Sequence, residues 1–390
     1  MTASAADVLA NIDLFADDQR EHLLDALAVA RKECPVVHTH SDGGYYLVTR
    51  YEDVRTVCLR PAIFSSAQPG LRGVPVRLIP LDVDPPDHRQ YRRFLDRYFS
   101  RSFLLRYEEQ LREIARDAMA GFIGDGRVEM ARDYAVPFIA GSLARVVFAT
   151  DNMELMRRGV AAVKRCALES TPETFEAVAL LAVEAVTEAG DRSADDRNVL
   201  GALAGASIDG RPLTAGEQVA IVTTLLLGGL DTTRGAIVNI AYHLATREDV
   251  EPILRTPDWW RGPLDEFLRF ETTVAFMART VTQDTELAGT PLKPGDRVVV
   301  QFYSGNRDAA RFDRPDELVF DRHLNPHLAF GAGVHRCLGQ HFARIQLMIA
   351  FEELLKQATN FRLEEGADIP RQAGVPFGSP AKLHLTFDRR

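Results

Sequence analysis

The sequence predicts a mainly α-helical protein with a smaller β-rich part. Helical patterns dominate residues 85–280, whereas short strand patterns bounded by glycine and proline occur near 35–80 and 280–390. The sequence has neither an internal repeat nor a low-complexity linker, so we expect one domain over residues 1–390. A chain of 390 residues is long enough to bury a large hydrophobic core.

The first strand pattern follows a glycine pair. Gly43-Gly44 precede the run Tyr45–Thr49, which is typical of a turn that enters a strand. Residues 64–80 are rich in glycine, proline and serine, so we expect a long loop there, and such loops are usually functional or mobile.

A basic helix is predicted after this loop. Asp84 has the residue type of an N-cap, and Pro85 suits the first helical position. His88 and Arg92 are four residues apart, so they share a face that could bind an anionic group. Arg89, Arg93 and Arg97 form a second basic stripe on a neighbouring face. This stripe is either a docking surface for an acidic partner or a solvated face.

The best-defined helix begins with a capping box, Thr214 with Glu217, and can continue to about Thr246. A helix of that length is expected to cross the whole protein. Its middle, residues 227–233, is poor helix sequence, because Gly228 and Gly229 each cost about 1 kcal/mol and Asp231 competes for backbone hydrogen bonds. Such a conflict is expected at a functional site, although a glycine-mediated helix crossing is the simpler alternative.

Two further patterns carry candidate residues. Glu266 and Arg269 stand three residues apart on a helical stretch, so they can form an ion pair, although surface pairs of this kind are common. Cys337 lies in the run 330–339, after two glycines and before a helical pattern from Leu338 to about Lys356. The helix N-terminus should favour an anion, so we expect the Cys337 thiol to ionise readily. It could be a nucleophile, a redox sensor, a metal ligand or a buried structural cysteine.

Composition excludes several classes of protein. The net charge of −9 gives no support to nucleic-acid binding. The four cysteines, at positions 34, 58, 166 and 337, include no C-x-x-C pair, which disfavours a zinc site and a disulfide framework. The first twenty residues carry acids and no apolar run, so we expect neither a signal peptide nor a membrane anchor, and a cytoplasmic enzyme.

Together these patterns resemble the cytochrome P-450 superfamily of haem-thiolate monooxygenases, in particular its soluble bacterial branch. The most specific part is Phe330-Gly331-x-Gly333-x-His335-x-Cys337-x-Gly339, and two weaker motifs, Gly229-x-Asp231-Thr232 and Glu266-x-x-Arg269, precede it at suitable distances. The resemblance implies the P-450 fold, with the long central helix over the haem. It also departs from the family in that Gly305 stands where an alanine usually precedes Asn-Arg-Asp.

The resemblance implies a haem b cofactor and a role for each matching residue. Cys337 would be the iron ligand, and Asp231 with Thr232 the catalytic acid–alcohol pair that delivers protons. Arg322 would join Glu266 and Arg269 in a structural triad that braces the cysteine loop. Residues implied to bind the haem are His88, Arg92, Gly229, Arg279, Phe330, His335, Cys337 and Gly339. Residues implied to line the substrate pocket are Ile79, Thr224, Leu227, Val274, Ala275 and Phe377.

The implied reaction is hydroxylation or epoxidation of a hydrophobic small molecule with O₂. The chain carries no flavin- or nicotinamide-binding pattern, so electrons are expected from an external ferredoxin and its reductase. Oxidative coupling or peroxide-driven chemistry, and a non-catalytic haem sensor, remain alternatives. No nucleic acid or membrane partner is expected.

Overall fold

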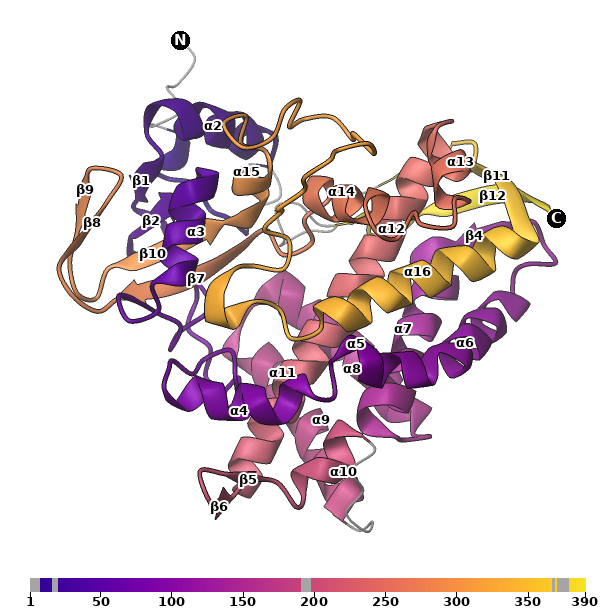
Figure 1. Ribbon diagram of the computed structural model, residues 1–390, viewed down its shortest axis with the longest axis horizontal. Helices are drawn as coiled ribbons and strands as arrows, with labels where there is room; N and C mark the ends of the chain where they lie inside the picture. The colour runs from indigo at the N-terminus through magenta and orange to yellow at the C-terminus, as the bar shows by residue number, and fades with distance from the viewer. Residues whose placement is uncertain (1–7, 16–19, 191–197, 367–368, 370–378) are drawn as a thin grey trace.

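The computed structural model describes residues 8–15, 20–190, 198–366, 369 and 379–390 (Figure 1). Within these residues the fold is mainly helical with smaller sheets, which confirms the predicted fold class. The helices are α2 (Arg20–Glu33), α3 (Tyr51–Leu59), α4 (Asp87–Asp96), α5 (Arg101–Leu104), α6 (Glu108–Ala120), α7 (Val136–Leu143), α8 (Met153–Glu169), α9 (Pro172–Gly190), α10 (Val199–Leu203), α11 (Ala215–Leu230), α12 (Thr232–Thr246), α13 (Val250–Leu254), α14 (Pro263–Phe270), α15 (Phe302–Asn306) and α16 (Gln340–Gln357).

Shorter elements connect these helices. The 3₁₀ turns are η2 (Ser41–Gly43), η3 (Leu105–Tyr107) and η6 (Gly333–His335), and the π-helical turns are η4 (Met130–Ala135) and η5 (Ala144–Phe148). The strands are β1 (Val36–Thr39), β2 (Tyr45–Val48), β3 (Phe64–Ser65), β4 (Arg127–Glu129), β5 (Ser207–Ile208), β6 (Arg211–Pro212), β7 (Phe276–Val281), β8 (Thr285–Leu287), β9 (Thr290–Leu292), β10 (Arg297–Gln301), β11 (Ala358–Leu363) and β12 (His384–Arg389).

The largest sheet joins segments that are far apart in the chain. Its strand order is β1-β2-β10-β7-β3, and β2 pairs in parallel with β10 across about 250 residues, with Leu47 opposite Val299. Successive side chains of a strand point to opposite faces of a sheet. Val298 and Val300 accordingly belong to the core cluster that includes residues of α3, whereas Val299 belongs to the cluster that includes residues of α2. Figure 1 shows this sheet at one end of the molecule and the helical part at the other.

The predicted central helix runs through the helical part, with one interruption. The Thr214 hydroxyl accepts a hydrogen bond from the Glu217 amide (3.2 Å), and the Glu217 carboxylate accepts one from the Thr214 amide (2.8 Å), so the capping box is confirmed. The helix breaks at Asp231, between α11 and α12, where the Thr232 hydroxyl donates to the Gly228 carbonyl (2.7 Å). Among the described residues one stretch, Ala215–Thr246, is long and apolar enough to span a membrane, but 61% of its most apolar window is buried inside the protein.

The predicted start of the basic helix is wrong by two residues. The helix α4 begins at Asp87, not at Pro85. Asp84 is not its N-cap, because the Asp84 carboxylate accepts hydrogen bonds from the Ser66 amide (2.9 Å) and the Ser65 hydroxyl instead. Asp84 therefore ties the beginning of the 64–80 loop to the base of α4.

Glu217 connects three elements at the start of α11. Its carboxylate accepts hydrogen bonds from both terminal nitrogens of Arg211 (2.6 and 2.8 Å), from the Tyr91 hydroxyl of α4 (2.5 Å), and from Thr214. These donors, Arg211 first, hold the pKa of Glu217 well below its usual range despite partial burial. Glu217 thus fixes α4, which carries His88 and Arg92, against the central helix.

We expect Glu217→Gln to lower the free energy of unfolding by about 1 kcal/mol at neutral pH, because a solvent-screened cap and ion pair are weakened together. The pKa of Glu217 is lower in the folded state than in the unfolded state, so its contribution is present above the unfolded pKa of about 4.3 and is lost as the pH falls below it. Urea unfolding across this pH range, with the exposed Glu113→Gln as control, measures both effects. A stability difference that does not change with pH would contradict the prediction.

Candidate active site

The cysteine loop, residues 328–339, is shaped by its own backbone. The Cys337 amide donates to the Phe330 carbonyl (2.8 Å), and the Gly331 amide donates to the Leu328 carbonyl (2.8 Å). Gly331 and Gly333 both have positive φ, +67° and +70°. A Cβ atom on Gly333 would lie 2.3 Å from the Cys58 carbonyl oxygen of α3, so only glycine fits there. The loop is therefore seated directly on the β-rich part.

The Cys337 side chain is exposed by its surface area, but many protein atoms surround its sulfur and desolvate it. Burial raises its pKa above the ordinary value, although the Gly339 amide and the charges of Arg92, Arg344 and Arg336 act in the opposite direction. The expectation that this thiol ionises readily is therefore wrong for the protein alone, because desolvation outweighs the helix terminus. A coordinated cation removes this penalty, because a thiol bound to a metal is deprotonated outright.

Beside the loop lies a basic cluster with unsatisfied donors. The rings of His88 and His335 lie 4.4 Å apart, between centroids. Within the described part of the chain, both ring nitrogens of His88 and Nε2 of His335 are buried without a hydrogen-bond partner. Burial lowers the pKa of His88 to about 4 and that of His335 to about 3, with positive charges on Arg92 and Arg279 adding to the effect.

These residues fit a haem group. Buried polar atoms without partners are rare, and an anion placed between His88, His335, Arg92 and Arg279 would accept their hydrogen bonds. Arg279 is only 4% exposed and donates to the Ala278 carbonyl (2.7 Å), whereas Arg92 donates to the Arg336 carbonyl (2.8 Å) and the Asp96 carboxylate. The propionates of haem would supply such an anion, and Cys337 would supply the sulfur for its iron.

The acid–alcohol pair lies at the break of the central helix. Nε of Arg234 donates to the Asp231 carboxylate (2.8 Å), and Asp231 keeps 21% of its side chain exposed. Arg234 was not among the predicted site residues, although it stands three residues after Asp231, the same spacing that predicted the pair of Glu266 and Arg269. Gly229 allows α11 to pack closely against α7, which is the simpler alternative considered for this glycine. A Cβ atom at Gly229 would lie 2.8 Å from Cδ1 of Leu143 in α7. Gly228 has open space at that position.

Glu266, Arg269 and Arg322 are brought together in the protein interior. Arg269 donates two hydrogen bonds to the Glu266 carboxylate (2.7 and 2.8 Å), and Arg322 donates from Nε (3.1 Å). Glu266 and Arg269 are almost fully buried. Burial alone would raise the pKa of Glu266, but its hydrogen bonds to Arg269 and its other donors outweigh burial and lower it.

This triad is linked to the cysteine loop through one asparagine. Arg269 donates to the Asn306 carbonyl (2.8 Å), and the Asn306 side-chain oxygen accepts from the Leu328 amide (2.6 Å), where the cysteine loop begins. The neighbouring Gly305 explains the departure from the family pattern, because a Cβ atom there would lie 2.9 Å from Leu328.

The residues implied to line the substrate pocket do not share one environment. Thr224, Leu227 and Val274 are partly exposed. Ile79 is packed into the helical core, and Ala275 is packed into the N-terminal cluster that includes α2. Phe377 lies outside the described residues.

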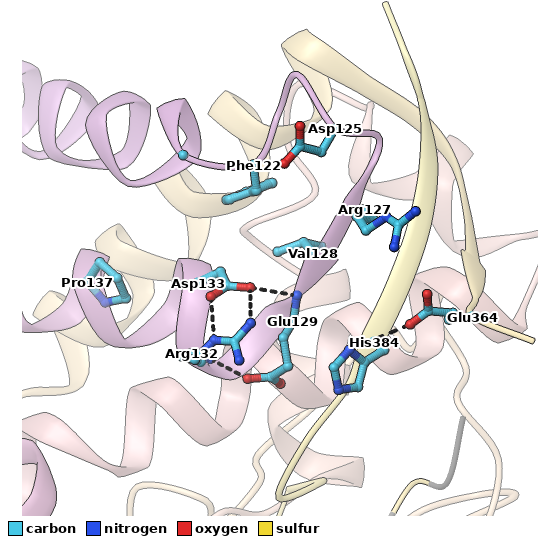
Figure 2. Close-up of a pocket in the computed structure, with 11 residues that line it drawn as sticks. Phe122, Asp125, Arg127, Val128, Glu129, Arg132, Asp133, Pro137, Glu364 and His384 are labelled. Carbon is cyan, nitrogen blue, oxygen red and sulfur yellow. Dashed lines mark hydrogen bonds and ion pairs between the residues drawn. The ribbon is translucent and has the colours of Figure 1, made fainter. Parts of the chain in front are cut away.

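A separate cleft of about 470 Å³ lies between the end of α6, β4, η4 and β12 (Figure 2). None of the predicted site residues lines it. Its best-placed carboxylates already accept internal hydrogen bonds, Asp133 from Arg132 and Glu129 from the amides of Ala131 and Arg132. We therefore assign the active site to the region of Cys337 and not to this cleft.

Comparisons with known proteins identify the family of the chain. Residues 263–383 match the family model described as cytochrome P450. The chain is 31% identical to the putative cytochrome P450 126 of Mycobacterium tuberculosis, over 93% of each chain, and 26% identical to the steroid C26-monooxygenase of Mycolicibacterium smegmatis, over 88% of each. The structure of cytochrome P450 CYP101C1 superposes with a TM-score of 0.86 at 24% identity, covering 100% of both chains. The chain therefore belongs to the cytochrome P450 family, as a haem-thiolate oxidoreductase of its bacterial monooxygenase branch.

Proposed function

We propose that the protein uses O₂ and electrons from an external ferredoxin to hydroxylate or epoxidise a hydrophobic small molecule in the cytoplasm. The observation that carries this proposal is the glycine-shaped loop that presents Cys337 beside the unsatisfied His88 and His335. Haem b held by Cys337 would supply the chemistry, because a thiolate ligand pushes electron density onto the iron and favours O–O cleavage.

We assign proton delivery to Thr232 and Asp231. The Thr232 hydroxyl donates a hydrogen bond to the Gly228 carbonyl (2.7 Å), so its oxygen is left to accept a hydrogen bond from a water molecule that would carry the proton. One oxygen of Asp231 is used by Arg234, which leaves the second oxygen to exchange a proton with solvent. This pair favours monooxygenation over peroxide-driven chemistry or a sensor role, neither of which requires two delivered protons. Oxidative coupling driven by O₂ needs the same protons, so it stays the alternative reaction.

For the substrate, we propose an apolar compound. The side chains of Leu227 and Val274 are apolar and partly exposed, and the Thr224 hydroxyl is already hydrogen-bonded to the Ala220 carbonyl (2.9 Å). The similarity to a steroid C26-monooxygenase makes steroids a sensible first class to screen, before terpenes, polyketides and aromatic metabolites. A shift of the haem iron to the high-spin state on addition of a compound, measured in the absorption spectrum, identifies binding. If only charged, polar compounds gave this shift, the pocket would not be apolar.

For the electron donor, we propose docking on α4. Arg89, Arg93 and Arg97 are exposed, and Arg97 stacks on Phe94 (5.0 Å) and Tyr98 (4.5 Å). Because α4 also carries Arg92, whose side chain bonds to the cysteine loop at Arg336, an acidic ferredoxin bound there would lie close to the haem edge.

Replacing Cys337 with serine tests the function most directly. We expect the Cys337→Ser protein to lose the thiolate signature in the ferrous carbonyl spectrum, since serine cannot supply a thiolate. The matched control is Cys34→Ser, which removes an exposed cysteine elsewhere and should leave the spectrum unchanged. A retained thiolate signature in Cys337→Ser would remove Cys337 from the iron.

Replacing Thr232 with alanine tests proton delivery. We expect normal haem binding but about tenfold less product per electron consumed, because proton transfer in the reaction slows. Thr246→Ala is the control, since its hydroxyl makes the same bond to a carbonyl four residues earlier (Tyr242, 2.8 Å) at the far end of α12. Unchanged coupling in Thr232→Ala would show that Thr232 does not deliver protons.

Charge reversal tests the docking surface. The double variant Arg89→Glu, Arg93→Glu should raise the apparent KM for ferredoxin by about tenfold and weaken its dependence on salt, because an attractive charge pattern becomes repulsive. Arg145→Glu, at an exposed arginine of η5, is the control. If the two proteins behave alike, the stripe on α4 is only a solvated face.

A further inference from the structure

Asp265 is adjacent to the buried Glu266, yet it belongs to a different set of contacts. Its Oδ1 lies 3.3 Å from Nε2 of His327 and within 2.8 and 3.2 Å of Nη2 and Nε of Arg344. His327 immediately precedes the cysteine loop, and Arg344 lies on α16, which follows it. One carboxylate oxygen therefore bridges the two ends of the loop that holds Cys337.

The hydrogen bonds fix the form of the histidine ring. The Ala329 amide donates to Nδ1 of His327 (3.2 Å), so Nδ1 is an acceptor and carries no proton. The proton of the neutral ring is then on Nε2, which donates to Asp265. Burial lowers the pKa of His327 in spite of the Asp265 charge, so the ring is neutral at physiological pH. The pKa of Asp265 is also lowered, because His327 and Arg344 outweigh its burial.

The two partners of Asp265, His327 and Arg344, contact the same aromatic ring. The guanidinium carbon of Arg344 lies 4.5 Å from the centroid of Phe330, and the ring of His327 lies 5.8 Å from it. The Phe330 carbonyl accepts the hydrogen bond of the Cys337 amide. The position of Phe330 therefore determines how the backbone of Cys337 is held.

We propose that Asp265, His327 and Arg344 form a positioning cluster that holds Phe330 over the cysteine loop and limits the access of water to the Cys337 sulfur. Asp265 and His327 act on the iron ligand through Phe330, whereas Arg344 both packs against Phe330 and interacts with Cys337 through its charge. The cluster is distinct from the Glu266 triad, which reaches the loop through Asn306. This inference rests on the assignment of Cys337 as the iron ligand.

The consequence is electronic as well as structural. Hydrogen bonding and solvation of a ligand sulfur withdraw electron density from the metal, and they favour the reduced state, which carries one more negative charge. Loosening Phe330 should therefore raise the midpoint potential of the haem iron and make the thiolate easier to protonate.

The test is Asp265→Asn in the haem-loaded protein. We expect a higher midpoint potential, and about tenfold faster conversion of the ferrous carbonyl complex from the thiolate to the thiol form, since charge-assisted bonds to both partners are lost. Asp258→Asn is the matched control. Asp258 lies seven residues before Asp265 and forms an exposed ion pair with Arg261, so this variant removes a carboxylate away from the cysteine loop.

A second variant keeps the inference testable if Asp265→Asn fails to fold. Arg344→Lys keeps a positive charge beside Asp265 but removes the planar group that covers Phe330, and it should shift both readouts in the same direction by a smaller amount. If both properties stay at wild-type values in every variant that folds, even with reduced thermal stability, the cluster is merely structural and the inference is overturned. A wild-type protein without a thiolate spectrum would instead refute the assignment of Cys337.

Discussion

Glu266 and Arg269 are both withdrawn from water, and two buried opposite charges are tolerated only when every remaining donor and acceptor is satisfied. The Glu266 carboxylate also accepts from the Val319 amide (2.8 Å) and from Asn325 (2.9 Å), while Arg269 donates to the carbonyls of Asn306, Pro315 and Glu317. The irregular segment between α15 and the cysteine loop is folded around these two charges. Its lack of regular secondary structure is therefore compatible with a fixed position for Cys337.

The relation between the loop and its cofactor is one of mutual dependence. In the protein alone, burial disfavours the Cys337 thiolate, and His88 and His335 are neutral with nitrogens left unbonded. A metal cation at the sulfur and carboxylates at the histidines would correct both deficits at once. The free energy of haem binding therefore contributes to the stability of this part of the fold, as in other sites whose ligands are strained without the metal.

The sequence predicted local features well and distant contacts poorly. The capping box of Thr214 and Glu217 and the helix after Cys337 follow from neighbouring residues, and the fold contains both. The poor helix sequence at 227–233 was recognised, but the interruption of the helix at Asp231 was not predicted. Asp84 was assigned as an N-cap because of its residue type, but Ser65 and Ser66, about twenty residues away, compete for its carboxylate. Ala275 packs against α2, and Asp265 meets residues 62 and 79 positions later, which no local pattern in one sequence can indicate.

The contact of Gly333 with the Cys58 carbonyl has a consequence for biosynthesis. The loop that presents the sulfur is translated long after α3, on which it is seated, and β2 must also wait for β10. Pairing of segments so distant in sequence is slow to form. The strands β1 and β2 consequently emerge from the ribosome long before β10, and the protein can capture its prosthetic group only after the cysteine loop has been translated.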